Sequence, residues 1–288
     1  MTNHEYLQSI LKDEKIDHTV EETKKTRAEV KDFLIKHYEK EKNPTYVYTG
    51  SIAKNTAIRI KYDIDIGLQF NNEDFETLED MFDDVKITLE KEYGKANVRE
   101  QNVSIRIQKN GHDIDIVPGR RIENNKNDVY LHIERENDTR IKSNLHIHVN
   151  EIEKFAETET IKLLKIWRIK KDFKFKSFAL ELMTKKAFED KTFSGLDTKF
   201  KHMMNYIVDN IDDIRLKDPA NSNNIISDSI KDAHKNQIKK FAKRALKCIE
   251  NNKWATIFDN SNGKCLTDSD TNALVASFAT IAPKPYGF

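Results

Sequence analysis

The chain has 288 residues, of which 38% are hydrophobic and 34% charged, and its formal net charge at neutral pH is +1. This length can bury a substantial core, as one large domain or two modest ones. The near-neutral charge argues against long nucleic acid being held by charge alone. No apolar run is long enough to span a membrane, and the first residues lack a signal-peptide pattern, so we expect a cytoplasmic protein without a membrane partner.

Helical spacing of apolar residues predicts that the first forty residues are helical, with Thr19 and Glu22 spaced as a capping box. The middle of the chain then predicts a helix over 75–93 and strands at 46–48, 62–70, 103–108, 112–117 and 129–133. After residue 150 the pattern is helical, over 152–170, 178–189, 196–211 and 225–250. This change of class predicts a lobe of mixed strands and helices over 1–149 and a helical lobe over 150–288, packed around one cleft.

Acidic residues alternate with apolar residues at two places in the predicted strands. Asp63 and Asp65 lie in DIDIG, and Asp113 and Asp115 repeat the alternation in HDIDIVPG. Residues two apart on a strand share a face, so each pair of carboxylates projects together. Like charges so close are costly unless a cation sits between them. The pattern therefore predicts a site for hard divalent ions where the two strands meet.

Gly50 and Ser51 follow a predicted strand and precede a short segment of helical character. Glycine lets the backbone approach a phosphate, and serine offers both an amide and a hydroxyl. By itself, a Gly-Ser pair is more often an ordinary turn. The pair becomes a candidate phosphate site because Asp63 follows Ser51 by only twelve residues.

Two divalent ions suit phosphoryl or nucleotidyl transfer. One ion lowers the pKa of an attacking hydroxyl, and the other holds the triphosphate and the leaving pyrophosphate. No nucleophilic His or Ser is then required. We therefore expect two Mg²⁺ ions as cofactor, with Mn²⁺ as the alternative, and nucleoside triphosphates as substrates. The competing interpretation is that the acidic residues only make one face of a sheet soluble.

The order GS, then DxD, then a third Asp in DIDIVPG resembles the DNA polymerase β-type nucleotidyltransferase superfamily. More narrowly it resembles the oligoadenylate synthase-like and cGAS/DncV-like enzymes. Two later segments add to the resemblance: LLKIWRIKKDFKFKSFALELMTKKAFE in the second lobe, and DPANSNNI after it. The resemblance implies an α+β fold, in which a polymerase β-like lobe of mixed sheet and helices packs on a helical second lobe. The active site would lie in the cleft between them.

The resemblance also implies roles for particular acidic residues. Asp63, Asp65 and Asp115 would be the catalytic metal ligands. Asp115 takes the third position because it precedes the apolar pair and the proline in DIVP. Asp113 would then lie beside the site without binding the metal directly.

The nucleotide would be bound by Gly50 and Ser51 together with residues of the second lobe. Lys165 lies in an apolar helix and would otherwise be read as a lysine whose head group reaches the surface, but the resemblance implies that it reaches the triphosphate. Ser177 heads the next helix, a favourable place for an anion. Phe178 would stack on a base, with a place in the core as the alternative. Relatives often carry tyrosine here, and phenylalanine lacks its hydroxyl.

Four other polar residues have weaker patterns. Asn223 and Asn224 either contact a base or cap the following helix, and we favour capping. His146 and His148 have the spacing of metal ligands on one face of a strand, but no third ligand is nearby, so a surface strand is the better interpretation.

The predicted function is metal-dependent condensation of ATP, GTP or UTP into a small cyclic di- or trinucleotide, with release of pyrophosphate. No long nucleic-acid activator is expected, because the chain lacks a cysteine-rich insertion and a strong basic balance. DIVPGRR and KSFALELM resemble bacterial synthases of anti-phage signalling, which implies an effector protein that senses the product. One alternative is an RNA- or tRNA-tailing nucleotidyltransferase. Another is an RNA-binding regulatory module, which the presence of all three carboxylates and Ser51 disfavours.

Overall fold

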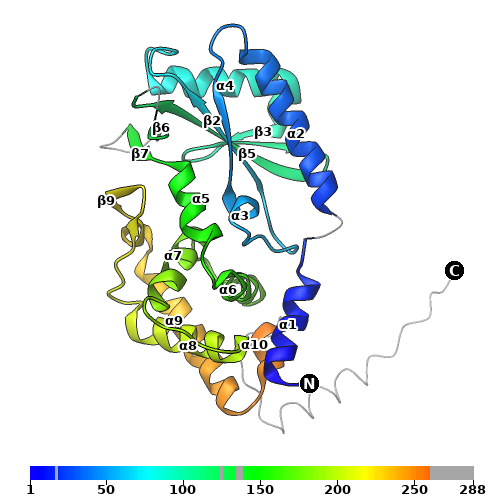
Figure 1. Ribbon diagram of the computed structural model, residues 1–288, viewed down its shortest axis with the longest axis vertical. Helices are drawn as coiled ribbons and strands as arrows, with labels where there is room; N and C mark the ends of the chain where they lie inside the picture. The colour runs from blue at the N-terminus through cyan, green and yellow to red at the C-terminus, as the bar shows by residue number, and fades with distance from the viewer. Residues whose placement is uncertain (17–18, 124–125, 134–138, 260–288) are drawn as a thin grey trace, which may run out of the picture.

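The computed structural model describes residues 1–16, 19–123, 126–133 and 139–259. It consists of a sheet part and a helical part, with helix α5 between them (Figure 1). The helices are α1 (Asn3–Asp13), α2 (Thr19–Tyr38), α3 (Gly50–Ala53), α4 (Leu78–Tyr93), α5 (Leu145–Glu153), α6 (Thr158–Lys170), α7 (Ser177–Ala187), α8 (Leu196–Asn210), α9 (Asp232–Glu250) and α10 (Trp254–Phe258), with short 3₁₀ turns η1 (Lys95–Asn97) and η2 (Ile226–Ser229). The strands are β1 (Thr45–Thr49), β2 (Ile64–Phe70), β3 (Val98–Glu100), β4 (Ile105–Lys109), β5 (His112–Arg121), β6 (Val129–His132), β7 (Arg140–Ser143), β8 (Lys217–Asp218) and β9 (Asn221–Ile225).

Strands β1 to β7 form one mixed sheet. Its main path runs β1-β2-β5-β4-β3, and β6 and β7 continue from the far end of β5. Strand β2 is parallel to β5, and the other pairs are antiparallel. The central pair β2 and β5 therefore carries two acidic segments side by side in the same direction.

Alternation along β2 assigns its two faces. Ile64, Ile66, Leu68 and Phe70 are fully buried and belong to a core that includes residues of α2 and α4. The intervening residues face the other side, where Gly67 lies against Leu145 of α5. The acidic residues of the alternation are on this second face. The sheet thus turns its apolar side to α2 and α4 and its acidic side to the helical part.

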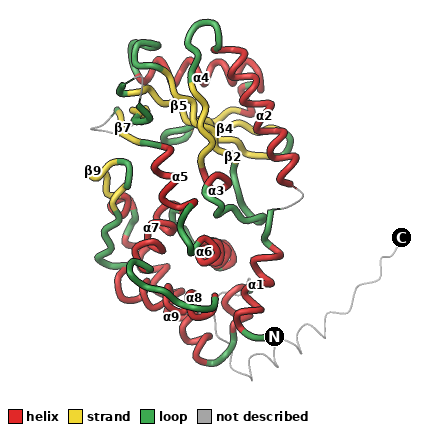
Figure 2. Tube along the Cα trace, viewed as in Figure 1, coloured by secondary structure: helices red, strands yellow, loops and turns green. Residues whose placement is uncertain are grey.

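The helical part has its own core, built around Trp167 and Phe200, with α6, α7, α8, α9 and α10 contributing. Helix α1 packs against α6 and α8, whereas α2 packs against the sheet. Figures 1 and 2 show α1 beside the helical part and α2 beside the sheet. The first forty residues therefore serve both parts of the molecule. The division into domains at residue 150 stays a prediction.

The predicted α+β fold with a mixed sheet is confirmed. The single helix predicted over 152–170 is wrong, because the chain forms α5 and α6 with a break between them. The predicted surface strand at His146 and His148 is also wrong, since both residues lie on α5. Asn144 explains this outcome: its side chain accepts a hydrogen bond from the amide of Ile147 and caps the helix.

The start of the helix predicted over 225–250 is also wrong, because α9 begins at Asp232. The preceding residues form the hairpin β8–β9, so Asn223 and Asn224 lie on a strand and do not cap a helix. Asp218 holds this hairpin, accepting hydrogen bonds from the amide of Ala220 and from the side chain of Asn224. A capping role for these asparagines had only local sequence in its favour, whereas Asp218 fixes the hairpin through side-chain contacts.

Two further findings bear on the sequence predictions. The proposed capping box of Thr19 and Glu22 depends on the Thr19 side chain, which lies outside what the structure describes, although α2 does begin at Thr19. In the described part of the chain, no helix combines the length and the apolar character that crossing a bilayer requires.

Candidate active site

The acidic residues of β2 and β5 are aligned by the register of the sheet. Asp65 is paired with Asp115 across the parallel strands. Asp63 lies two residues before Asp65, and Asp113 lies two residues before Asp115. The predicted meeting of carboxylates from two strands is therefore present. Because parallel pairing sets neighbouring side chains side by side, the repulsion between these charges is built into the sheet.

Arg106 of β4 lies among these carboxylates. It pairs with Asp115 across the antiparallel strands, and its Nε and Nη2 donate to the two Asp115 oxygens at 2.8 and 2.9 Å. Nη1 donates to Asp113 at 2.8 Å and Nη2 to Asp63 at 3.0 Å. Gln101 adds a donor to Asp115 at 3.1 Å. A guanidinium is well suited to this role because its donors form a fixed planar fork.

One arginine does not balance the whole cluster. Burial, and then the charges of Asp115 and Asp63, raise the pKa of Asp65 to about 7. Burial also raises the pKa of Asp63, although Arg106 opposes this shift. Asp65 receives no hydrogen bond from Arg106 in the described set of contacts. Ionised Asp65 is therefore disfavoured by burial first and by its acidic neighbours second, and a cation bound beside it would favour the ionised form.

Gly50, the first residue of α3, packs directly against the side chain of Asp65. Its φ is +72°, a conformation that L side chains rarely adopt, and a Cβ atom at this position would lie 1.7 Å from Oδ2 of Asp65. Only glycine fits both conditions. Ser51 follows directly, on α3, so the Gly-Ser segment and Asp65 form one surface.

A cavity of about 210 Å³ joins this surface to the helical part. Seven of the eight predicted site residues line it: Gly50, Ser51, Asp63, Asp65, Lys165, Ser177 and Phe178. The eighth, Asp115, is linked to the same place through Arg106 and the register with Asp65. Residues far apart in the sequence are thus brought to one cavity.

Lys165 is not extended into open space. It is 3% exposed, and its Nζ donates to Glu181 at 2.6 Å and to the Thr56 hydroxyl at 2.7 Å. Glu181 also accepts from Lys54 at 3.0 Å and from Thr56. Burial would raise the pKa of Glu181, but the charges of Lys54 and Lys165 outweigh it and lower that pKa. Two lysines around one carboxylate leave a net positive charge beside the cavity.

The other two predicted residues of the helical part lie at the start of α7. Ser177 accepts a hydrogen bond from Arg168 at 3.0 Å. Phe178 is half-buried, with its ring 4.8 Å from the ring of His148 and with the Lys54 ammonium 4.3 Å above it. His148 is held in turn by Asp218 at 2.7 Å. Phe178 therefore contacts the helical core on one side and lines the cavity on another.

The donor set suits Mg²⁺, which prefers carboxylate oxygens. Among the residues that the structure describes, no three His, Cys, Asp or Glu side chains are already gathered as a metal-binding group. Arg106 provides positive charge between the carboxylates instead. The carboxylates of Asp63, Asp65 and Asp115 are oxygen donors of the kind that a divalent ion takes, and a cation beside Asp65 would offset its unfavourable ionisation. Metal ligation by Asp63, Asp65 and Asp115 remains a prediction.

Sequence reasoning missed several residues that line or shape this site: Lys54, Thr56, Lys61, Arg106, Arg168 and Glu181. A signal for Arg106 was present, because it alternates with Ile105 and Ile107 and so lies on a polar strand face. No local pattern identifies Glu181, because its partners Lys54 and Thr56 are more than a hundred residues away.

The sequence model of the Second Messenger Oligonucleotide or Dinucleotide Synthetase domain, SMODS, matches residues 1–154. The chain belongs to the SMODS family. It is therefore a nucleotidyltransferase of a family that makes second-messenger oligonucleotides or dinucleotides, as the sequence resemblance implied. Comparison with curated proteins gives no match.

Solved structures share the fold of this SMODS protein over most of its length. The E. coli MS115-1 CdnC structure in complex with HORMA-deltaN has a TM-score of 0.73 at 18% identity and covers 92% of this chain and 98% of that one. CdnC with ATP has a TM-score of 0.72 at 19% identity, covering 91% and 98%. Vibrio cholerae DncV with a linear intermediate has a TM-score of 0.62 at 14% identity, covering 79% and 70%. At these identities the likeness establishes the fold.

Replacing Gly50 by alanine tests the contact with Asp65. We expect turnover to fall at least about tenfold, because a displacement near 1 Å at a reacting centre has effects of this order or larger. The matched control is Gly111→Ala, where φ is also positive, at +75°, but a Cβ atom would meet nothing within 4 Å. Steady-state rates of pyrophosphate release and urea unfolding measure the two effects. Equal activity losses in both variants would contradict the proposed contact.

Replacing Glu181 by glutamine tests the buried ion-pair cluster. The change leaves Lys54 and Lys165 without their carboxylate, and breaking a buried pair costs about 3–5 kcal/mol. We expect that loss in the free energy of unfolding, measured by urea denaturation. Glu153→Gln, at an exposed position on α5, should change it by less than about 0.5 kcal/mol. A Glu181 variant as stable as this control would show that the cluster adds nothing to stability.

Proposed function

We propose that this SMODS enzyme uses two Mg²⁺ ions to join nucleoside triphosphates into a cyclic di- or trinucleotide, with release of pyrophosphate. The observation that carries the proposal is the cavity in which acidic residues of the sheet part face cationic residues of the helical part. Carboxylates suit metal ions, and lysine and arginine suit the triphosphate. Nucleotidyl transfer needs both, on opposite sides of one substrate.

We assign the metal ions to Asp63, Asp65 and Asp115. When bound, the ions would favour deprotonation of the attacking hydroxyl and neutralise charge on the leaving pyrophosphate. Arg106 shares Asp63 and Asp115 in the structure, so its contact with Asp113 at 2.8 Å becomes important. We propose that Asp113 anchors the guanidinium near the site while the other carboxylates turn to metal. That gives Asp113 a supporting role without direct ligation.

We assign the triphosphate to Gly50, Ser51, Ser177 and the cluster that Lys54 and Lys165 form around Glu181. Ser177 stands at the first turn of α7, where backbone amides and the helix dipole favour an anion. Lys165 contributes as part of its cluster, because its ammonium is fixed by Glu181 and Thr56. Lys54 and Lys165 together carry one more charge than Glu181 neutralises, and that charge faces the phosphates.

We assign a base to the exposed part of Phe178. His148 packs against this ring and Lys54 lies over it, so the ring is held in a fixed orientation. Stacking on an aromatic ring is tolerant of base identity, because every base has a π-face. Selection among ATP, GTP and UTP would then depend on hydrogen bonds from other residues. Relatives are known with GTP, in Bradyrhizobium diazoefficiens CdnG, and with GTP and Apcpp, in Elizabethkingia meningoseptica CdnE.

The biological role follows the family. We propose that the enzyme acts in the bacterial cytoplasm, in anti-phage signalling, and that an effector protein senses its product. No long nucleic-acid activator is proposed, in keeping with a net charge of +1. The cyclic AMP-GMP synthase activity named for Vibrio cholerae DncV supports cyclisation as the final step in this fold.

Asp65→Asn tests the metal assignment. We expect turnover to fall by a factor of roughly a thousand or more, since charge stabilisation of the transition state is the largest contribution to catalysis. Asp83→Asn on the exposed side of α4 is the control and should retain full turnover.

Stability separates this loss from misfolding. The pKa of Asp65 lies near 7 in the folded protein and near 3.8 in the unfolded chain, so its ionisation destabilises the fold above pH 7, and this cost disappears as the pH falls toward 4. Without metal at pH 8, the asparagine variant should therefore melt at or above the wild-type temperature. An Asp65 variant with near-wild-type turnover would remove this residue from the metal site.

Product analysis tests the reaction itself. Purified enzyme is incubated with Mg²⁺ and α-³²P-labelled ATP, GTP, CTP and UTP, singly and together, with and without added RNA. Products are treated with phosphatase and separated by thin-layer chromatography. A small product whose mobility phosphatase leaves unchanged supports cyclisation, because a ring has no terminal phosphate to lose, whereas a linear product loses its terminal phosphates and migrates differently. Label on RNA would support the tailing alternative, and a phosphatase-sensitive linear product would contradict ring closure.

A further inference from the structure

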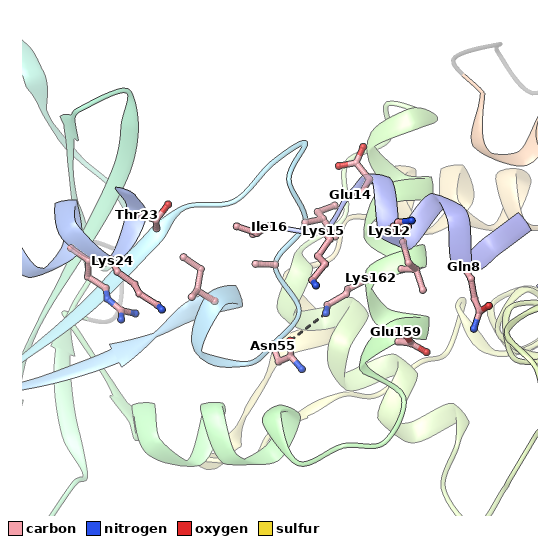
Figure 3. A pocket seen from close by; sticks show the side chains of 15 residues that line it. Gln8, Lys12, Glu14, Lys15, Ile16, Thr23, Lys24, Asn55, Glu159 and Lys162 are labelled. Atoms are coloured by element: carbon pink, nitrogen blue, oxygen red, sulfur yellow. Dashed lines mark hydrogen bonds between the residues drawn. The ribbon is translucent and has the colours of Figure 1, made fainter. Parts of the chain in front are cut away.

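A second cavity lies at the junction of α1 and α2, next to the segment that carries Gly50 and Ser51. Its volume is about 520 Å³, compared with about 210 Å³ for the catalytic cavity. Figure 3 shows its lining, which comes from α1 and the residues after it, α2, α3 and the following segment, and α6. Cavities that bind small molecules have volumes of about 300–1,000 Å³. None of the residues assigned to substrate or metal above lines this cavity.

The cavity is lined by more positive than negative side chains. The cations are Lys12, Lys15, Lys24, Arg27 and Lys162, and the acids are Glu14 and Glu159. Glu14 is already engaged, because it accepts a hydrogen bond from the amide of Ile60 at 2.8 Å. Lys24 pairs with Glu21 at the surface. Within the described residues, the other four cations have no carboxylate within ion-pair distance.

Two of these cations are placed where a negative ligand would satisfy them. Lys162 donates to the side-chain oxygen of Asn55 at 3.2 Å, and Figure 3 shows Lys15 beside it. Burial and the charge of Lys15 lower the pKa of Lys162, against the effect of Glu159. Arg27 lies 3.7 Å from the centre of the Tyr48 ring, and its buried Nε has no hydrogen-bond partner among the described residues. Buried donors normally have a partner.

The remaining lining is apolar. Leu11, Ile16, Ile52, Ala57 and Ile58 contribute to it. Inorganic phosphate alone would leave this surface in contact with water. A ligand with an apolar body and a phosphate group would cover it and also meet the cations.

The position of the cavity connects it to catalysis. Ile52 and Asn55 lie on the segment that carries Gly50, Ser51 and Lys54, and Ile58 lines both cavities. The lining also joins the two parts of the molecule, since α1 and α6 pack in the helical part and α2 packs on the sheet. A ligand here would contact both walls of the catalytic cleft from behind.

We propose that this cavity is a second, non-catalytic binding site for a small organic phosphate with an apolar body. The ligand bridges α1, α2 and α6 and supports the segment that carries Gly50 and Ser51. The site goes beyond the proposed reaction and does not depend on which nucleotides are joined or whether the product is cyclic.

The test uses 1-naphthyl phosphate, a fluorescent aromatic phosphate, titrated into the full-length protein. The double variant Lys15→Ala/Lys162→Ala should bind at least about tenfold more weakly, because it removes two cationic donors that the phosphate would meet. The matched control is Lys25→Ala/Lys170→Ala, which removes the same charge from the same region outside the cavity. This control should bind within about twofold of wild type.

Further arms keep the test decisive. Lys15→Glu, at an exposed position, gives a single charge reversal for the case in which the double variant does not fold, and it should also weaken binding. Arg168→Ala alters the catalytic cavity and should leave probe affinity unchanged. Inorganic phosphate should bind more weakly than 1-naphthyl phosphate. Equal affinity in wild type and in both cavity variants, or loss of affinity in Arg168→Ala alone, would overturn the proposal.

Discussion

The central constraint in this molecule is the side-by-side register of two acidic strands. Parallel pairing of β2 and β5 sets Asp65 beside Asp115, so the fold itself forces like charges together. Arg106 compensates part of this charge, and it reaches three carboxylates only because β4 pairs with β5 in a matching register. The position of Asp65 also requires glycine at residue 50, because the backbone there packs against Asp65 without room for a side chain. The acidic face, the arginine and the glycine loop therefore depend on one another.

Near this acidic face, the single buried carboxylate of Glu181 binds two lysines, Lys54 and Lys165. Glu181 contacts Lys54 and Thr56 of the segment after α3 as well as Lys165 of α6. Glu181 therefore binds both lysine ammonium groups and links the two parts of the molecule. Burial lowers the pKa of Lys165 and Lys54 adds to that effect, whereas the charge of Glu181 opposes it. The cost of each buried charge is thus reduced by a neighbour from the other part.

The sequence predicted those features that follow from local periodicity and from family resemblance. Alternation in DIDIG and HDIDIVPG placed the carboxylates on one strand face, and the structure brings seven of the eight predicted residues to one cavity. Arg106 and Glu181 were missed because their roles depend on sheet register and on contacts across more than a hundred residues. The surface strand predicted at His146 and His148 was wrong because their spacing fits a strand locally, whereas the Asn144 cap begins a helix there.

The placement of α1 has a mechanical consequence. Within the described residues, α1 packs in the helical part and α2 packs on the sheet, and α5 leads from the sheet part to α6, so the two parts are connected at two places. A body attached at one point can swing in any direction, but a body attached at two points turns mainly about the line that joins them. The two connections therefore limit the directions in which the sheet part and the helical part can shift relative to each other.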